Sequence, residues 1–170
     1  ELSTRKAIEI KPNFAEAHYN LGIILNDLGN LQEAEFSYRK AIELKPDYAE
    51  AHLNLGIILN NLGKLYDSEL SYRKAIEIKP DYAEAYSNLG IILRDLDKSQ
   101  EAEKILRKAI IIKPSWQAYF NYASCLYEKK EFDSALENLY KGRVFIDIKH
   151  ISVTFKASIA SINSSKKQLR

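Results

Sequence analysis

Four asparagines recur at a nearly constant spacing, and their chemistry is suited to binding a peptide backbone. They are separated by 34, 34 and 33 residues: Asn20, Asn54, Asn88 and Asn121. A carboxamide offers two hydrogen-bond donors and an acceptor, so it can pair with a peptide bond whatever side chain that peptide carries. Such a row would hold an extended chain with little dependence on its sequence. The alternative is that each asparagine bonds a neighbouring helix and fixes the register of the repeats, and both roles can hold together.

The residues that could support catalysis or bind a metal do not form a comparable row. His18 and His52 lie at packing positions of different helices, so we expect each to be satisfied within its own helix pair and not to share a zinc ion. Cys125 stands where other repeats carry isoleucine, which predicts a small buried side chain. The glycines are explained by packing or turns and form no phosphate-binding loop. We therefore predict no enzyme activity, no cofactor and no metal.

The elements that would position the asparagines follow from a repeat of 34 residues. Residues 15–48 match residues 49–82 at 26 of 34 positions. The prolines of the chain stand at the same spacing: Pro12, Pro46, Pro80 and Pro114. A period of this length is typical of stacked helical units, each of which packs on its neighbours.

Each repeat has the pattern of two helices joined by a short turn. In the first repeat, apolar residues at helical spacing predict a helix over residues 14–28. Gly29 ends this helix, and a second helix runs to about residue 44, just before the next proline. A polar residue followed three positions later by glutamate, as in Asn13 and Glu16, predicts that the side chain of Asn13 caps the first helix.

The order of small and large residues within each unit resembles the tetratricopeptide repeat (TPR). Counted from Ala15, Ala49 and Ala83, position 7 is leucine, position 8 is glycine, and positions 20 and 27 are small. The glycine leaves room for the partner helix to approach. The usual tryptophan at position 4 is replaced by histidine or tyrosine. The resemblance implies an all-α fold, a right-handed α-solenoid of antiparallel helix pairs that forms a TPR superhelix.

We divide the chain on this pattern into one partial repeat, four repeats and a C-terminal helix. The segments are 1–12, the second helix of a truncated repeat; 13–46, 47–80 and 81–114, three regular TPRs; 115–147, a degenerate TPR counted from Trp116, with Asp147 in place of the proline; and 148–170, a capping helix over 149–163 followed by a frayed tail. The chain starts within a repeat and lacks methionine, so we expect a fragment of a longer protein. Leu2, Ala7 and Ile8 should pack on the next repeat.

The resemblance also implies where a ligand would bind. The first helices of TPR arrays line a concave face, and the asparagine row resembles the inner surface of the TPR superhelix of O-GlcNAc transferase. Neighbouring positions mix apolar and polar residues, which suits an extended peptide with a few apolar anchors. Besides the asparagines, we predict that the groove contains Tyr19, Leu53, Phe120, Asn26, Asp27, Asn60, Asn61, Arg94 and Asp95. Some TPR domains clamp a C-terminal carboxylate with basic residues, but here Arg94 alone should stand free in the groove.

The function that we predict is a protein–protein interaction scaffold that binds an extended peptide segment along the asparagine row. One alternative is the substrate-recruiting TPR arm of a larger, glycosyltransferase-like enzyme. Another is a self-assembly module, in which the bare N-terminal helix of one chain meets the end of another, or a spacer with no ligand of its own.

Composition argues against other classes of partner. A net charge of +2 over 170 residues gives no reason to expect nucleic acid or an acidic membrane. No apolar run reaches the ~18 residues that a membrane span needs. The single Cys125 cannot form an internal disulfide, so nothing requires an oxidising compartment, and we expect a cytoplasmic location.

Overall fold

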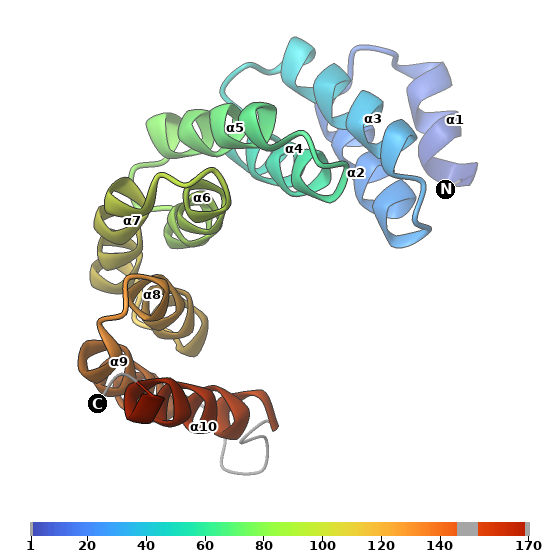
Figure 1. Ribbon diagram of the computed structural model, residues 1–170. Helices are drawn as coiled ribbons and strands as arrows, with labels where there is room; N and C mark the ends of the chain where they lie inside the picture. Colours follow the sequence, from blue (N-terminus) through green and yellow to red (C-terminus); the bar gives the residue numbers. More distant parts are fainter. Residues whose placement is uncertain (1, 146–152, 169–170) are drawn as a thin grey trace. The chain divides into compact units, whose positions relative to one another are not determined.

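The computed structural model describes residues 2–145 and 153–168, and within these ranges every regular element is an α-helix (Figure 1). The helices are α1 (Leu2–Ile10), α2 (Ala15–Asp27), α3 (Leu31–Leu44), α4 (Ala49–Asn61), α5 (Leu65–Ile78), α6 (Ala83–Asp95), α7 (Ser99–Ile112), α8 (Trp116–Glu128), α9 (Phe132–Arg143) and α10 (Val153–Gln168). The predicted all-α fold of repeated helix pairs is confirmed. Of the helices in these ranges, none combines the length and the apolar character needed to span a membrane.

The helices group into two compact units, residues 1–88 and 89–170, and the division falls inside α6. In the N-terminal unit α2 packs on α3, α4 packs on α5, and α3 also contacts α4. One cluster of buried side chains joins the two pairs: Leu21, Leu25, Ala34, Tyr38, Leu55, Ile58 and Leu59. Each pair therefore completes its core with residues of the next pair, as stacked repeats must.

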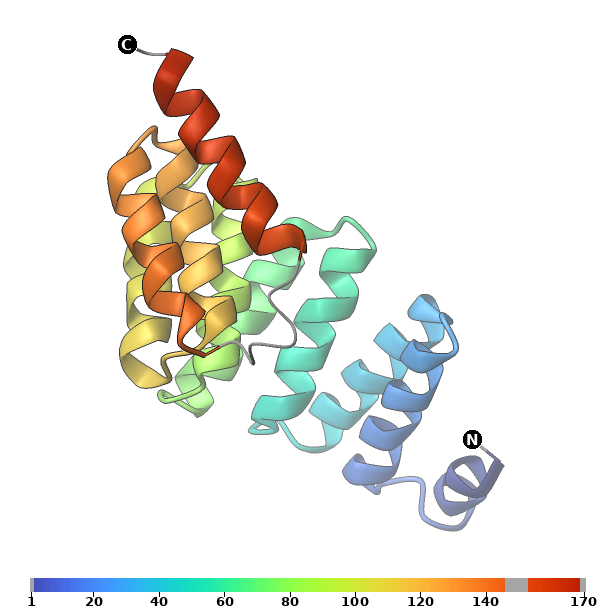
Figure 2. The same cartoon turned by 90° about the horizontal axis from the view of Figure 1, so that it is seen from below.

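In the C-terminal unit α7 packs on α8, α8 packs on α9, and α10 packs on α9. Figure 2 shows α10 alongside the α8–α9 pair. Ile162 of α10 is only 4% exposed. Tyr127 Oη of α8 and Ser165 Oγ of α10 share a hydrogen bond of 2.9 Å. These contacts make α10 an integral part of the unit.

Both ends of the chain depart from the sequence prediction. Residues 164–168 were expected to fray but continue α10, because Ser165 bonds Tyr127 and Lys166 forms an ion pair with Asp133. Residues 149–152 of the predicted capping helix, and Asp147, lie outside the described residues. At the other end Ile8 packs on the core as predicted, whereas Leu2 is 71% exposed and does not.

A close approach between the helices of each pair confirms the role predicted for the glycine at position 8. A Cβ added to Gly56 would lie 2.6 Å from a ring atom of Tyr72, and one added to Gly22 would lie 2.6 Å from Tyr38. Such distances are too short for real carbon atoms. The small residues at positions 20 and 27 are completely buried, as expected where helices meet. At Ser68 the hydroxyl also donates a hydrogen bond of 2.7 Å to the Gly56 carbonyl.

The cap predicted for the first helix of the first repeat is wrong. The residue before α2 is Phe14, in an extended conformation and with no side-chain cap, so Asn13 lies one residue too early to cap the helix. Glu16 instead lies 3.7 Å from Lys45, at the end of the second helix of the same repeat. Ser115 does cap α8, because its Oγ accepts a hydrogen bond from the Ala118 amide.

The turn inside each pair requires a backbone that favours glycine. Gly29 and Gly63 have φ values of +76° and +73°. The equivalent residues of the next two repeats, Asp97 and Lys130, hold the same conformation with φ values of 59° and 63°. A side chain makes this left-handed conformation costly.

We predict that enlarging Gly56 destabilises the protein. Gly56→Leu should cost about 3 kcal/mol, since the buried Tyr72 ring leaves no room for the new side chain. The measurement is urea unfolding followed by circular dichroism. In the fourth repeat Ala123 and Leu139 occupy the same two positions and are both buried. Gly56→Ala combined with Tyr72→Leu should therefore lose less stability than the sum of the single changes, and strict additivity would contradict this packing.

We predict that Asp97→Gly stabilises the protein by about 0.5–1 kcal/mol, because glycine adopts positive φ without strain. Lys130→Gly should act in the same direction. The reverse change, Gly63→Ala, should lower the midpoint of thermal unfolding. An Asp97→Gly variant that is less stable than the parent would show that the aspartate side chain stabilises this turn.

Candidate functional site

A small pocket lies between the first helices of the first two repeats, on the face where the asparagine row was predicted. It has a volume of about 250 Å³ and lies between α2 and α4. Its lining is formed by Ile23, Asn26, Tyr38, Asn54, Ile57 and Ile58. We call it the α2–α4 pocket. Two amides beside isoleucine side chains provide both polar and apolar contacts for a bound chain.

Asn54 connects the two helices beside this pocket. Its Nδ2 donates a hydrogen bond of 3.1 Å to the Tyr19 hydroxyl. The Tyr19 ring lies 4.8 Å from the Tyr48 ring and 5.9 Å from the Tyr38 ring, between centroids. Burial raises the pKa of Tyr19. At this asparagine the side chain therefore bonds a neighbouring helix, which is the contact that the register alternative requires.

The other asparagines of the row are in a different situation. Asn20 is exposed, and Asn88 and Asn121 are partly exposed. Over residues 2–145 and 153–168, the side chains of these three make no hydrogen bond to another group. The row thus combines one asparagine engaged between helices with three whose amides face solvent in part or in full.

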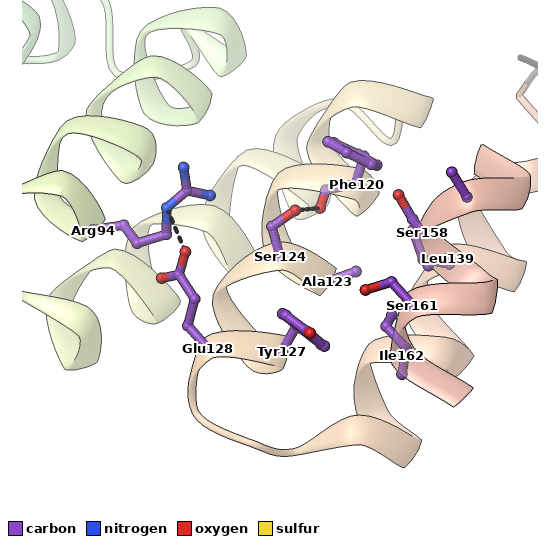
Figure 3. Close-up of a pocket in the computed structure, with 11 residues that line it drawn as sticks. Arg94, Phe120, Ala123, Ser124, Tyr127, Glu128, Leu139, Ser158, Ser161 and Ile162 are labelled. Carbon is purple, nitrogen blue, oxygen red and sulfur yellow. Dashed lines mark hydrogen bonds and ion pairs between the residues drawn. The ribbon is translucent and has the colours of Figure 1, made fainter. Parts of the chain in front are cut away.

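A second and larger pocket lies in the C-terminal unit, between α8 and α10 (Figure 3). It has a volume of about 500 Å³. Its lining comprises Arg94, Phe120, Ala123, Ser124, Tyr127, Glu128, Leu139, Ala157, Ser158, Ser161 and Ile162. We call it the α8–α10 pocket. Its floor is apolar, because Ala123, Leu139 and Ile162 are all buried.

Comparison with known families identifies the repeats. Residues 15–48 match one model of the tetratricopeptide repeat, and residues 47–115 match a second. Together the matches run from residue 15 to residue 115, more than half of the 170 residues. The chain belongs to the tetratricopeptide repeat family. A comparison with curated proteins finds no match.

Solved TPR structures have the same fold. A crystal structure of MamA matches with a TM-score of 0.77 and 26% identity, over 82% of each chain. YrrB, described as a TPR protein with an unusual peptide-binding site, matches with a TM-score of 0.77 and 22% identity, over 96% of this chain and 84% of its own. PilF of Pseudomonas aeruginosa gives a TM-score of 0.79 and 20% identity, over 99% of this chain and 82% of its own. The chain is thus an all-α helical repeat solenoid.

TPR repeats act in general as protein–protein interaction scaffolds and not as enzymes. A TPR chain is therefore expected to bind a protein or peptide partner, and the remaining question is which surface does so.

Two of the predicted groove residues differ from expectation. Leu53 is 3% exposed, so it belongs to the core of the TPR array and cannot anchor a ligand. Arg94 was expected to stand free, but its guanidinium lies 3.2 Å from Glu128 and 3.4 Å from Asp95. Figure 3 shows the Arg94–Glu128 pair at one side of the α8–α10 pocket. The carboxylates therefore neutralise the positive charge of Arg94, which was expected to be free in the groove.

The remaining predicted residues lie at or near the surface. Asp27, Asn61 and Asp95 are exposed, whereas Tyr19, Asn26, Asn60 and Phe120 are partly buried. The structure brings Asn26 and Asn54 together at the α2–α4 pocket, and Arg94 and Phe120 together at the α8–α10 pocket. Each group lies within one compact unit.

The sequence prediction missed the wall that α10 contributes to the larger pocket. An offset of 104 residues relates Leu53, Asn54, Ile57 and Ile58 of α4 to Ala157, Ser158, Ser161 and Ile162 of α10. The last three residues of each set line the corresponding pockets. The signal that could have revealed this is Ile159-Ala160, which stands at the Leu-Gly of positions 7 and 8. It is weak, since alanine is common in helices.

His18 and His52 are hydrogen-bonded, but to the preceding repeat and not within their own helix pairs as predicted. His18 Nε2 lies 2.9 Å from the Pro12 carbonyl, and His52 Nε2 lies 3.0 Å from the Pro46 carbonyl. Each ring thus bonds the proline that ends the preceding helix. Cys125 is buried and unbridged. Among the residues that the structure describes, no three His, Cys, Asp or Glu side chains gather as metal ligands would.

We predict that His52 makes stability depend on mildly acidic pH. Burial lowers the pKa of His52, with Lys74 adding to this effect, while the Pro46 carbonyl and Glu77 oppose it. The unfolded chain keeps a pKa near 6.5, so this contribution is complete above about pH 6.5 and is lost as the pH falls towards the lower folded pKa. His52→Tyr, which copies the buried Tyr86 of the next repeat, should reduce the loss of thermal stability between pH 7 and pH 5. Equal losses in both proteins would refute this prediction.

Proposed function

We propose that the chain binds an extended peptide segment along its first helices and that the asparagine row pairs with the backbone of that segment. The α2–α4 pocket is the main support for this proposal. It sets the amides of Asn26 and Asn54 beside the apolar side chains of Ile23 and Ile57. An extended chain presents backbone groups and side chains alternately, so a surface with both kinds of contact suits it.

The hydrogen bond between Asn54 and Tyr19 is compatible with ligand binding. It uses one of the two Nδ2 protons and leaves the carbonyl oxygen of the same amide. Holding the amide in one orientation reduces the entropy that binding would otherwise cost. The register role and the binding role can therefore reinforce each other at this residue.

A location in the cytoplasm and an end-to-end assembly through α1 remain predictions. Leu2 and Ile10 of α1 are 71% and 86% exposed, which is the surface such an assembly would use.

The test that separates binding from register uses three single variants. A displayed library of random decapeptides is selected on the wild-type chain, and the affinity of the selected peptides is measured by fluorescence anisotropy. Asn20→Ala should weaken binding by roughly threefold to tenfold, the net value of one hydrogen bond, without a change in thermal stability. Asn54→Ala should weaken binding by a similar factor and also lower stability.

Tyr19→Phe is the matched control, because it removes the hydroxyl that accepts from Asn54 and keeps the ring. It should lower stability slightly and leave most of the affinity in place. If Asn20→Ala binds as the wild type does, and Asn54→Ala and Tyr19→Phe change stability alone, the asparagines fix register only and the proposed function is wrong.

A further inference from the structure

The two pockets occupy the same place in the repeat but differ twofold in size. Each lies between the first helix of a repeat and the helix that holds the equivalent place in the next one. Each is also lined by the residue at position 24 of the second helix, which is Tyr38 in the α2–α4 pocket and Leu139 in the α8–α10 pocket. The α2–α4 pocket has a volume of about 250 Å³, and the α8–α10 pocket one of about 500 Å³. The side chains that line the two pockets contribute to this difference.

Two replacements put smaller side chains into the larger pocket. Position 9 of the first helix is Ile23 in the α2–α4 pocket and Ser124 in the α8–α10 pocket. Across each pocket, Ile57 of α4 is replaced by Ser161 of α10. Both changes remove a large apolar side chain from facing walls, whereas the floor stays closed by Ile58 in one case and Ile162 in the other.

The larger pocket offers little net charge to a ligand. The guanidinium of Arg94 is paired with Glu128 and Asp95. The Ser124 hydroxyl donates to the Phe120 carbonyl across 3.0 Å, and Tyr127 is bonded to Ser165. A charged group entering this pocket would lose its hydration without finding an unpaired counter-charge. An uncharged group is therefore favoured.

Aromatic rings on α8 form part of the wall. Phe120 and Tyr127 lie two turns apart on α8, and both border the space between α8 and α10 (Figure 3). Aromatic side chains associate in offset or edge-to-face arrangements that are worth more than their buried area alone. The pocket is also large enough for one ring of the size of phenylalanine, tyrosine or tryptophan.

We propose that the α8–α10 pocket receives an aromatic side chain of the bound segment and gives the array its side-chain selectivity. This inference rests on the proposed function, in which asparagines hold the backbone and contribute no selectivity. The aromatic ring packs between Phe120 and Tyr127 above the apolar floor, and the serine hydroxyls of α8 and α10 border its edge.

The test closes the pocket with the side chains that the regular repeats carry. Ser124→Ile with Ser161→Ile restores the residues found at Ile23 and Ile57, so the helices should tolerate both changes. Ser164→Ile is the matched control, because it makes the same substitution at an exposed position of α10 that does not line the pocket. Helicity and the thermal unfolding midpoint are measured for all proteins.

The probes are N-acetyl-phenylalanine amide and N-acetyl-alanine amide, titrated into the ¹⁵N-labelled chain and followed by amide chemical shifts. The phenylalanine probe should shift amides of α8 and α10 in the wild type and in Ser164→Ile. Its affinity should fall by about tenfold or more in the double variant, since an aromatic ring can no longer be buried. Equal binding of both probes, no shift in the wild type, or unchanged affinity in a folded double variant would each overturn the proposal. If the double variant unfolds, Ser161→Ile alone provides the same comparison.

The same variants separate this inference from the proposed function. One outcome is that the selected decapeptides lose affinity for the Asn20→Ala variant but show no enrichment in aromatic residues. This result would support backbone binding and contradict the aromatic pocket. The opposite outcome is that the phenylalanine probe binds the α8–α10 pocket while the asparagine variants do not change the affinity for the decapeptides. This result would support the aromatic pocket and contradict the asparagine row as the backbone site.

Discussion

The close contact between the glycine at position 8 and the large residue at position 24 is the constraint on which the rest of the array depends. Gly22 meets Tyr38, Gly56 meets Tyr72, and Gly90 meets Leu106, each at a distance that excludes a side chain on the glycine. The glycine side of the first helix therefore faces the second helix. The asparagine at position 6 lies on the opposite side of the first helix. The helix pair, and not any single helix, is therefore the structural unit that presents a binding surface.

Neighbouring repeats share a core, and they are also joined by ion pairs between lysine and glutamate side chains. Lys64 bonds Glu35 of the preceding repeat across 2.7 Å, and Lys129 bonds Glu103 in the same manner. Burial alone would raise the pKa of Glu35, but hydrogen bonds from Lys64 and Arg39 outweigh it and the net pKa is lowered. Such pairs contribute little energy individually when they are near the surface. Their repetition favours one register between successive helix pairs.

The sequence predicted the helix pairs well because its strongest signals are local. Proline spacing and the glycines mark where helices end and where they touch, and both effects act within one repeat. The solvent exposure of individual side chains was harder to predict, since Tyr19 and Leu53 share position 5 but only Leu53 is buried. Burial there depends on side-chain length and on the next repeat, which a pattern within one repeat does not encode. The α10 wall was missed because Ala157, Ser158 and Ser161, which line the pocket, are too small to give an apolar signal.

The range of the contacts along the chain has a consequence for how the protein folds. Side-chain hydrogen bonds between successive repeats join residues 26 to 38 positions apart, such as Cys125 with Ser99 and Tyr127 with Ser165. Closing loops of this length costs less entropy than closing longer ones, and chains dominated by contacts between neighbouring segments fold quickly. A nucleus can form in any one pair and spread outward in both directions. Because each pair completes its core with the next pair, a nascent chain can begin to fold once two neighbouring helix pairs have been synthesised.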